Sequence, residues 1–235
     1  MPINRAFQRL KKPRKDGFFC VQYIVYIQHK KILYVVYWNN KNNKIGGFMG
    51  STRDNTYTNT NNRTFYLSDD VDNESIGKLM WDILYQIRED DKKDEKEKDY
   101  KREPIKLYIN SYGGSVYDMW GLIDIILNSK TPIYTYCTGY AMSAAFKIFL
   151  AGHKRYCYKH STFMYHQMSC WRSGKYQDLV EDREEMDWLN KKNEEYVIDR
   201  TNLTKDDINE IREKKKDFYI HSDKAVKYGI VDEVL

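Results

Sequence analysis

Several features that direct a sequence toward a particular class of protein are scarce in this chain of 235 residues. No apolar run is long enough to cross a membrane, because polar residues interrupt the most apolar segment, "FFCVQYIVYIQHKKILYVVY". The net charge is only +5, from 39 basic and 34 acidic residues, and the charges are spread along the chain. We therefore expect neither a membrane nor a nucleic acid among the partners.

Cysteine and proline are also rare, at four residues each. The cysteines form neither a CxxC pair nor the Cys and His spacing typical of zinc sites; they are Cys20, Cys137, Cys157 and Cys170. We therefore expect reduced cysteines and no metal centre. The chain also lacks a dinucleotide-binding glycine pattern and a P-loop lysine, so no nucleotide cofactor is indicated.

Composition divides the chain into three parts. Residues 1–16 form a basic tail. Residues 17–61 contain two strand-like runs around "QHKK", which predict a β-hairpin, and then a turn-rich stretch that predicts a mobile loop. Residues 62–235 form the globular domain, in which strand-like and helical segments alternate. This alternation predicts an α/β fold with a mostly parallel sheet and right-handed crossovers.

The start of the globular domain gives the clearest local prediction. "TFYL" is typical of a strand, and Asp70 or Asp72 can cap a helix through "ESIGKLMWDILYQIRE", whose apolar residues recur on one face. "DDKKDEKEKDYKRE" follows with no aliphatic residue, so it predicts a solvated loop or a helix extension.

Four features of the domain carry candidate chemistry. "NSYGGSV" places two glycines after a strand, where backbone N–H groups lie open. "TGYAMSAAF" places Ser143 where a strand passes into a helix, "FMYHQ" contains His166, and "KKKDFYIHS" contains Asp217. Serine, histidine and aspartate in separate loops at strand ends are what a catalytic triad needs. Taken singly, each also has a structural interpretation as a tight turn, a helix cap, a sheet residue or a surface charge.

Together with "AVKYGIVDEV" near the C-terminus, these motifs resemble the proteolytic subunit of the Clp protease from about residue 62 to residue 235. The resemblance implies a crotonase-like ββα spiral with a protruding handle, formed by a strand and a long helix, at about residues 167–200. It further implies self-association into seven-membered rings. It also implies an AAA+ Clp chaperone as partner. That unfoldase would use the ATP, so the chain itself would need no cofactor.

The resemblance assigns roles to five residues of this chain. Ser143 falls on the nucleophile position, His166 on the base and Asp217 on the orienting acid. The backbone N–H groups of Gly114 and Ala144 would form the oxyanion hole, where two donors meet the charge that develops on the carbonyl oxygen.

The chain departs from that family along the substrate cleft. Tyr112 and Met168 stand where the family usually has proline. Cys170 and Trp171 stand where it has glycine, in the strand along which the substrate lies. A tryptophan at that position either fills the cleft or points outward, and the sequence leaves both open.

Three lysines depart from the family as well. Lys147 follows Ser143 by one helical turn, where the family has an apolar residue. A Ser–Lys dyad is conceivable there, but we expect an exposed or snorkelling side chain. Lys215 and Lys216 replace an acid–arginine pair that docks one ring on another, so we expect weaker ring-to-ring docking.

These departures favour a structural, non-catalytic subunit of the kind called ClpR, which plastid-bearing lineages carry. The alternative is an active Clp-type serine endopeptidase that cleaves unfolded polypeptides, since all three triad residue types are present. An acyl-CoA enzyme on the related crotonase fold is a more distant alternative. The ClpR-like interpretation implies catalytic Clp subunits as ring partners. It also implies a location in a plastid or apicoplast stroma, after loss of an upstream targeting segment.

Overall fold

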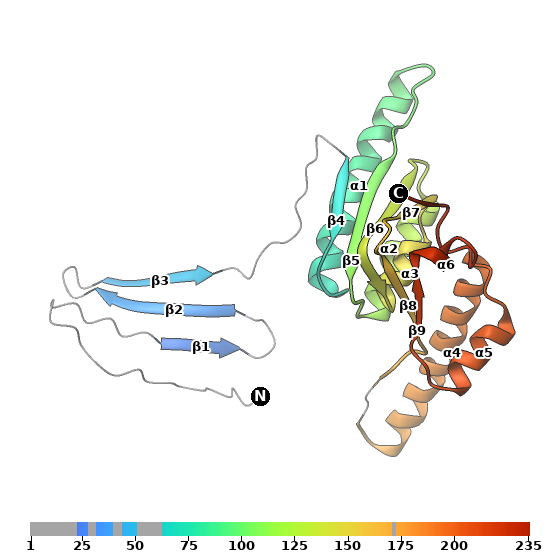
Figure 1. The fold of residues 1–235 in the computed structure, drawn as a ribbon. Helices are drawn as coiled ribbons and strands as arrows, with labels where there is room; N and C mark the ends of the chain where they lie inside the picture. Colours follow the sequence, from blue (N-terminus) through green and yellow to red (C-terminus); the bar gives the residue numbers. More distant parts are fainter. Residues whose placement is uncertain (1–22, 28–31, 40–43, 51–62, 171–172) are drawn as a thin grey trace. The chain divides into compact units, whose positions relative to one another are not determined.

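The structure, a computed structural model, describes residues 23–27, 32–39, 44–50, 63–170 and 173–235. The chain divides into two compact units, Met1–Asn55 and Thr56–Leu235. In the first unit, β1 (Tyr23–Ile27), β2 (Ile32–Asn39) and β3 (Lys44–Gly50) form an antiparallel sheet in that order (Figure 1).

The third strand of this sheet corrects the sequence prediction, which gave its residues to a loop. Lys44–Gly50 pairs antiparallel with β2 from Leu33 to Asn39, so backbone pairing outweighs the glycine content of the segment. The predicted basic tail of residues 1–16 lies outside the described residues, as does the remainder of the predicted loop, residues 40–43 and 51–61.

The second unit is an α/β domain. Its sheet has the order β10-β7-β6-β5-β4, and these strands are all parallel (Figure 1). Strand β8 pairs parallel with the C-terminal end of β6, and β9 pairs antiparallel with β8. The strands are β4 (Thr64–Leu67), β5 (Ile105–Ser111), β6 (Ile133–Met142), β7 (Lys154–Cys157), β8 (Thr162–Tyr165), β9 (Phe218–His221) and β10 (Glu233–Val234). The helices are α1 (Asn73–Lys96), α2 (Val116–Asn128), α3 (Ala144–Leu150), α4 (Tyr176–Arg200), α5 (Lys205–Glu213) and α6 (Ser222–Ala225). The predicted, mostly parallel α/β sheet is confirmed.

Helix α1 begins where its sequence predicts. The Asp72 carboxylate accepts a hydrogen bond from the Ser75 N–H at 2.8 Å, and the Ser75 hydroxyl lies 3.2 Å from the Asp72 N–H, which completes a capping box. The apolar face turns to the core, with Ile76, Leu79 and Ile83 buried. The charged stretch after it continues the helix to Lys96, which is the helix-extension alternative of the sequence prediction.

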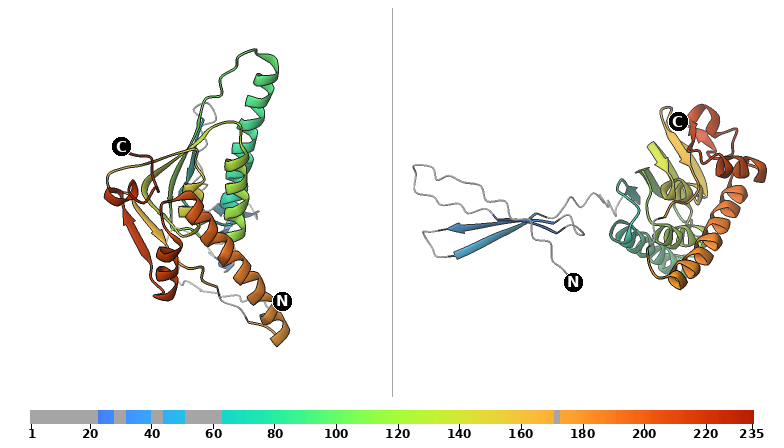
Figure 2. Two further views of the ribbon diagram at one scale, coloured as in Figure 1. Left: turned by 90° about the vertical axis from the view of Figure 1, so that its right-hand side faces the viewer. Right: turned by 90° about the horizontal axis from the view of Figure 1, so that it is seen from below.

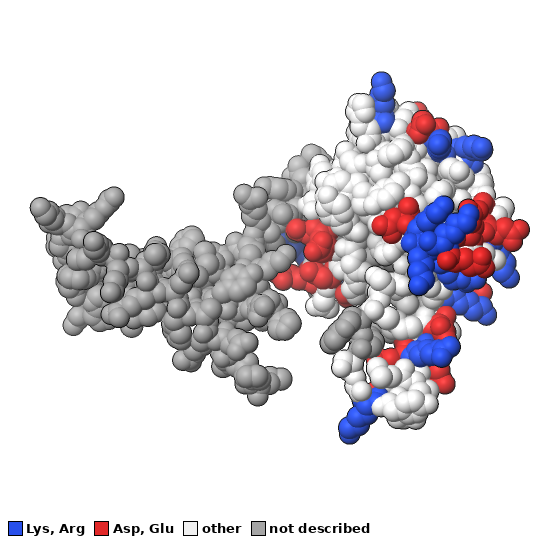
Figure 3. All heavy atoms as spheres, turned by 60° about the horizontal axis from the view of Figure 1, so that its bottom comes forward, with Lys and Arg blue, Asp and Glu red and all other residues white. Residues whose placement is uncertain are grey.

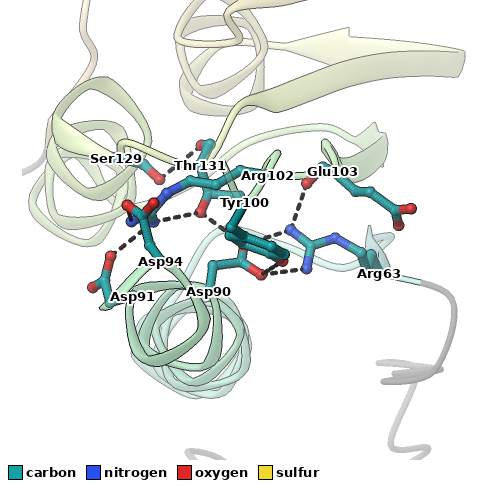
Figure 4. Close-up of polar contacts among 9 residues, drawn as sticks. All are labelled: Arg63, Asp90, Asp91, Asp94, Tyr100, Arg102, Glu103, Ser129 and Thr131. Carbon is teal, nitrogen blue, oxygen red and sulfur yellow. Dashed lines mark hydrogen bonds and ion pairs between the residues drawn. The ribbon is translucent and has the colours of Figure 1, made fainter. Parts of the chain in front are cut away.

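A buried carboxylate ties the end of α1 to the sheet (Figure 4). Asp90 has no exposed surface and receives two hydrogen bonds from the Arg63 guanidinium, at 2.8 and 2.7 Å. The hydroxyls of Thr131 and Tyr100 donate to the same carboxylate at 2.8 and 3.0 Å. Burial alone would raise the pKa of Asp90, but these donors and the Arg63 charge hold the pKa below its ordinary value.

The long helix α4 packs against α2 and extends beyond the sheet at its N-terminal end (Figure 2). Lys192 lies over the Trp120 ring at 4.2 Å, and the Tyr117 hydroxyl donates to Glu185 at 2.7 Å. The resemblance implies a strand before this helix, but residues 166–170 and 173–175 form none. A strand needs a hydrogen-bonding neighbour, and the described part of the chain places none beside this segment.

The surface and the helices of the described residues carry two further observations. On the face that Figure 3 shows, basic and acidic side chains are interspersed rather than gathered by sign. Within the described ranges, no helix combines the length and the apolar composition that a membrane crossing requires.

Candidate active site

Ser143 occupies a strained turn between β6 and α3. Its φ of 53° and ψ of −116° lie in a region that residues other than glycine rarely adopt. Holding a residue there costs on the order of 1–3 kcal/mol, and such strain is concentrated at functional sites. The Ser143 N–H donates to the Met164 carbonyl of β8 at 2.9 Å, which fixes the turn against the neighbouring strand. The predicted strand-to-helix position of Ser143 is therefore confirmed, and the side chain caps no helix N–H.

The glycine turn lies directly against this serine. A Cβ atom added to Gly113, whose φ is 98°, would come within 2.7 Å of the Ala144 nitrogen and 3.0 Å of the Ser143 Cβ. One added to Gly114, whose φ is 151°, would lie 2.3 Å from the Val71 oxygen. Both positions therefore exclude any side chain, because left-handed backbone and close contacts coincide there.

The two predicted oxyanion donors are available in the described residues. The Gly113 N–H donates to the Ser111 hydroxyl at 3.1 Å, whereas no acceptor is found for the Gly114 N–H. The Ala144 N–H begins α3 and has no intrahelical acceptor, since the first N–H groups of a helix never do. Their two backbone segments lie against one another beside Ser143, and their role as an oxyanion hole stays a prediction.

His166 follows the last residue of β8 and reaches Ser143. Its Nε2 lies 2.8 Å from the Ser143 Oγ, within the reach that a general base needs. Burial and the charge of Lys147 lower the pKa of His166, and Asp217 opposes them. A ring with a lowered pKa is neutral at pH 7, so its Nε2 can accept the proton of the serine.

Asp217, the predicted orienting acid of the triad, lies just before β9. The charge of Asp217 raises the pKa of His166, against the effects of burial and of Lys147. The carboxylate is exposed, however, and no hydrogen bond between Asp217 and the ring is present among the described contacts. The structure therefore brings Ser143 and His166 together as a pair and leaves the ring without its orienting bond.

The prediction of an exposed or snorkelling Lys147 is wrong. Only 3% of the residue is exposed, because every residue of α3 is buried and no side of this short helix faces solvent. Its ammonium lies 5.8 Å from the centre of the Tyr165 ring. Burial lowers the pKa of Lys147 to about 8, and among the described residues no carboxylate pairs with it.

The other residues that depart from the family along the predicted cleft differ in how far they are exposed. Tyr112 is 64% exposed, and its ring packs on that of Tyr140 with centroids 4.3 Å apart. Met168 is half-buried against the core, with its sulfur 4.0 Å from the amide nitrogen of Asn193. Cys170 is exposed, and Trp171 lies outside the described residues. The structure therefore places Tyr112, Met168 and Cys170, and the effect of Trp171 on the substrate cleft stays a prediction.

Lys215 and Lys216 lie in the exposed turn between α5 and β9, directly before Asp217. Lys215 has a φ of 48°, and its backbone N–H donates to the Arg212 carbonyl at 3.2 Å. The position of these lysines at the surface is compatible with an intermolecular contact, and the contact itself stays a prediction.

Sequence reasoning missed the residues that hold the glycine turn. The Val71 N–H donates to the Gly113 carbonyl at 2.8 Å, and the Ser115 N–H donates to the Val71 carbonyl at 2.7 Å. The Ser111 hydroxyl donates to the Asp69 carbonyl at 2.5 Å and receives the Gly113 N–H. A buried serine at the end of an apolar strand was a signal that could have found Ser111, whereas nothing local marks Val71.

Comparison with known proteins supplies the family. The family model described as Clp protease matches residues 51–235. The chain belongs to the Clp protease family. It is 31% identical over 175 residues to the ATP-dependent Clp protease proteolytic subunit 2 of Synechococcus sp. (strain CC9605), covering 74% of this chain and 83% of that protein. It is 33% identical to proteolytic subunit 1 of Synechococcus sp. (strain CC9902), with the same coverage, and 28% identical to that of Rhodopirellula baltica, over 74% of this chain and 72% of that protein.

Membership in the Clp protease family fits the geometry of the site. The resemblance predicted a nucleophile at a strand–helix turn, a histidine within its reach and a glycine turn beside it, and these are adjacent in the structure. The relatives named here are proteolytic subunits 1 and 2, and none carries the ClpR name that the departures had favoured. The catalytic status of the chain is accordingly a matter for proposal.

Proposed function

We propose that this Clp family chain is a serine-type endopeptidase subunit that cleaves unfolded polypeptides. The observation that carries the proposal is the 2.8 Å approach of the His166 Nε2 to the Ser143 Oγ. Ser143 would attack the scissile carbonyl while His166 takes its proton, and the Gly114 and Ala144 N–H groups would hold the oxyanion. His166 would then return the proton to the leaving amine.

A structural, ClpR-like subunit is the second candidate, and two observations favour it. Asp217 is exposed and makes no described hydrogen bond to His166, so the ring lacks the group that fixes its tautomer and orientation. Lys147 places an additional cation near the base. Both would slow the chemistry, and Ser143 would then be the remnant of a nucleophile within a subunit that completes a ring.

Peptide hydrolysis separates the two candidates. The purified chain and its Ser143→Ala variant are assayed with a short fluorogenic peptide and with an unfolded protein, alone and with a Clp ATPase. Turnover by the wild type that vanishes in the variant supports the endopeptidase. Equal background from both proteins under every condition supports the structural subunit, since loss of the nucleophile should cost about 10⁶-fold in a working site.

Assembly is the remaining part of the proposal. We expect the chain to form a seven-membered ring, alone or with catalytic Clp subunits, and to work with an AAA+ Clp chaperone, which supplies the ATP hydrolysis. Native mass measurement tests the ring, and a monomer at micromolar concentration would contradict it. Lys215 and Lys216 should weaken docking between two rings, so a double ring that survives moderate salt would speak against that part. A plastid-type or apicoplast stroma is the proposed location, which imaging of the tagged full-length protein can check.

A further inference from the structure

Helix α3 contains a buried cation, Lys147, one helical turn after the proposed nucleophile Ser143. The Lys147 N–H bonds to the Ser143 carbonyl at 3.4 Å, one helical turn along. Only 3% of Lys147 is exposed, and its ammonium lies 5.8 Å from the ring centre of Tyr165, the residue that precedes His166. The side chain of Lys147 therefore reaches from α3, which begins directly after Ser143, toward β8, which ends directly before His166.

Among the described residues, no carboxylate pairs with this cation. An ion pair between the neighbouring helices joins Glu194 of α4 to Arg212 of α5 at 3.0 Å, and these two charges largely cancel. The phenols of Tyr165 and Tyr196 are buried, which raises their pKa values, so both are neutral around pH 7. Among the described residues, Asp217 is the anion that acts on His166, and its exposed position allows water to screen it.

We propose that Lys147 is a positioning residue that acts on His166 through the protein interior, where its ammonium opposes formation of the imidazolium and so restrains Ser143 until the lysine loses its proton. In water this repulsion would be weak, but Lys147 is buried and His166 is partly buried, so water screens the repulsion less than it does between two exposed charges. Since burial lowers the pKa of Lys147 to about 8, the restraint is present at neutral pH and lifts in mildly alkaline solution.

The affected step is the transfer of the serine proton. With a fluorophosphonate, a bond forms between the Ser143 Oγ and phosphorus, fluoride leaves with its electron pair, and the serine proton moves to the His166 Nε2. A charged Lys147 makes the resulting imidazolium less stable, so it raises the barrier of this step alone. The inference rests on the proposed function of Ser143 as a nucleophile, but the pKa of His166 can be measured without any reaction.

Two neutral replacements and one control test the inference. Lys147→Met and Lys147→Gln remove the charge while keeping an unbranched side chain of similar length. Lys191→Met removes the same charge from an exposed position of α4, where Lys191 lies 3.9 Å from Glu195. The rate of fluorophosphonate labelling is followed for all four proteins from pH 6 to pH 10 in roughly half-unit steps, a range that spans the lowered pKa of Lys147.

For the wild type and Lys191→Met, we expect a labelling rate that climbs through about pH 8. Both Lys147 variants should lose that climb and label roughly tenfold faster at pH 7, a part of the ~10²–10⁴ that a general base contributes. Unchanged profiles in both Lys147 variants would overturn the inference. A change in Lys147→Met that Lys147→Gln does not share would also overturn it, because the effect would then follow shape and not charge.

Titration of His166 by NMR distinguishes failure of this inference from failure of the proposed function. In Lys147→Met the pKa of His166 should rise, whether or not Ser143 reacts, because the opposing charge is gone. If no protein is labelled but the pKa of His166 rises in the variant, the proposed enzyme fails and the electrostatic link stands. If the pKa of His166 stays where it is, the link is refuted.

Discussion

The end of α1 and the interior of α3 each bury one charged side chain, and their surroundings differ completely. Asp90 has hydrogen bonds from Arg63, Thr131 and Tyr100, and its pKa is held low. Lys147 has an aromatic ring nearby, no described carboxylate, and a pKa lowered to about 8. A buried charge with matched partners ties elements together, whereas an unmatched one is retained at a cost in stability. That cost lies beside the candidate nucleophile.

Removal of the paired charge should have the largest effect on stability. Asp90→Ala leaves the Arg63 guanidinium buried without its partner, so the free energy of unfolding should fall by about 3–5 kcal/mol. Urea unfolding at a fixed protein concentration measures it. Asp91→Ala is the control, because Asp91 is 47% exposed in its pair with Arg102 and should contribute under about 1 kcal/mol. Equal losses in the two variants would contradict the contrast.

Removal of the unpaired charge should act in the opposite direction. Lys147→Met should raise the free energy of unfolding at pH 7, since a pKa lowered from 10.5 to about 8 corresponds to about 3.5 kcal/mol at ~1.4 kcal/mol per pKa unit. Thermal unfolding against Lys191→Met gives the comparison. A destabilised Lys147→Met would show that the lysine has a partner or a packing role that outweighs its burial.

The same cost should appear as a pH dependence. Lys147 binds its proton more weakly in the folded chain than in the unfolded chain, so the destabilisation is complete below about pH 8 and disappears as the pH rises toward 10.5. From about pH 8 to pH 10.5, the free energy of unfolding of the wild type should therefore rise relative to that of Lys147→Met. Parallel curves for the two proteins between pH 7 and 10.5 would refute the lowered pKa.

Loss of the partly exposed ion pair between Arg212 and Glu194 should have the smallest effect on stability. The side chains of Arg212 and Glu194 are 38% and 15% exposed, and their atoms approach to 3.0 Å. Arg212→Gln should cost under about 1 kcal/mol, because water screens the pair. A loss of stability as large as that of Asp90→Ala would contradict this. It would show that the number of hydrogen-bond partners of a charged side chain, and not its burial, decides how much the side chain stabilises the fold.

Local patterns explain why much of the fold could be predicted. Asp72 caps α1 through its own side chain, and β4 has the predicted residues, because both depend on near neighbours in sequence. Ser143 was found for the same reason, since small residues at a strand–helix junction mark a tight turn. The family motifs extended this to His166, whose approach to Ser143 no local pattern gives.

Tertiary packing explains what could not be predicted. Lys147 lies on a helix so short and so enclosed that a polar residue has no solvent side, and the sequence does not show which helices are enclosed. The backbone support of Gly113 by Val71 joins residues 42 positions apart. Strand β3 was missed because its pairing with β2 outweighs the low strand propensity of its glycines.

Covalent labelling of Ser143 by a fluorophosphonate reports directly on whether the Ser143–His166 pair works as a nucleophile and base. The full chain is treated near pH 8.5, where the proposed restraint by Lys147 is largely lifted, and the modified residue is located by peptide mass measurement. We predict one label per chain, on Ser143, that Ser143→Ala and His166→Ala both lose. A folded wild type that stays unlabelled at every pH, or that is labelled equally well without His166, would contradict a working nucleophile at this site.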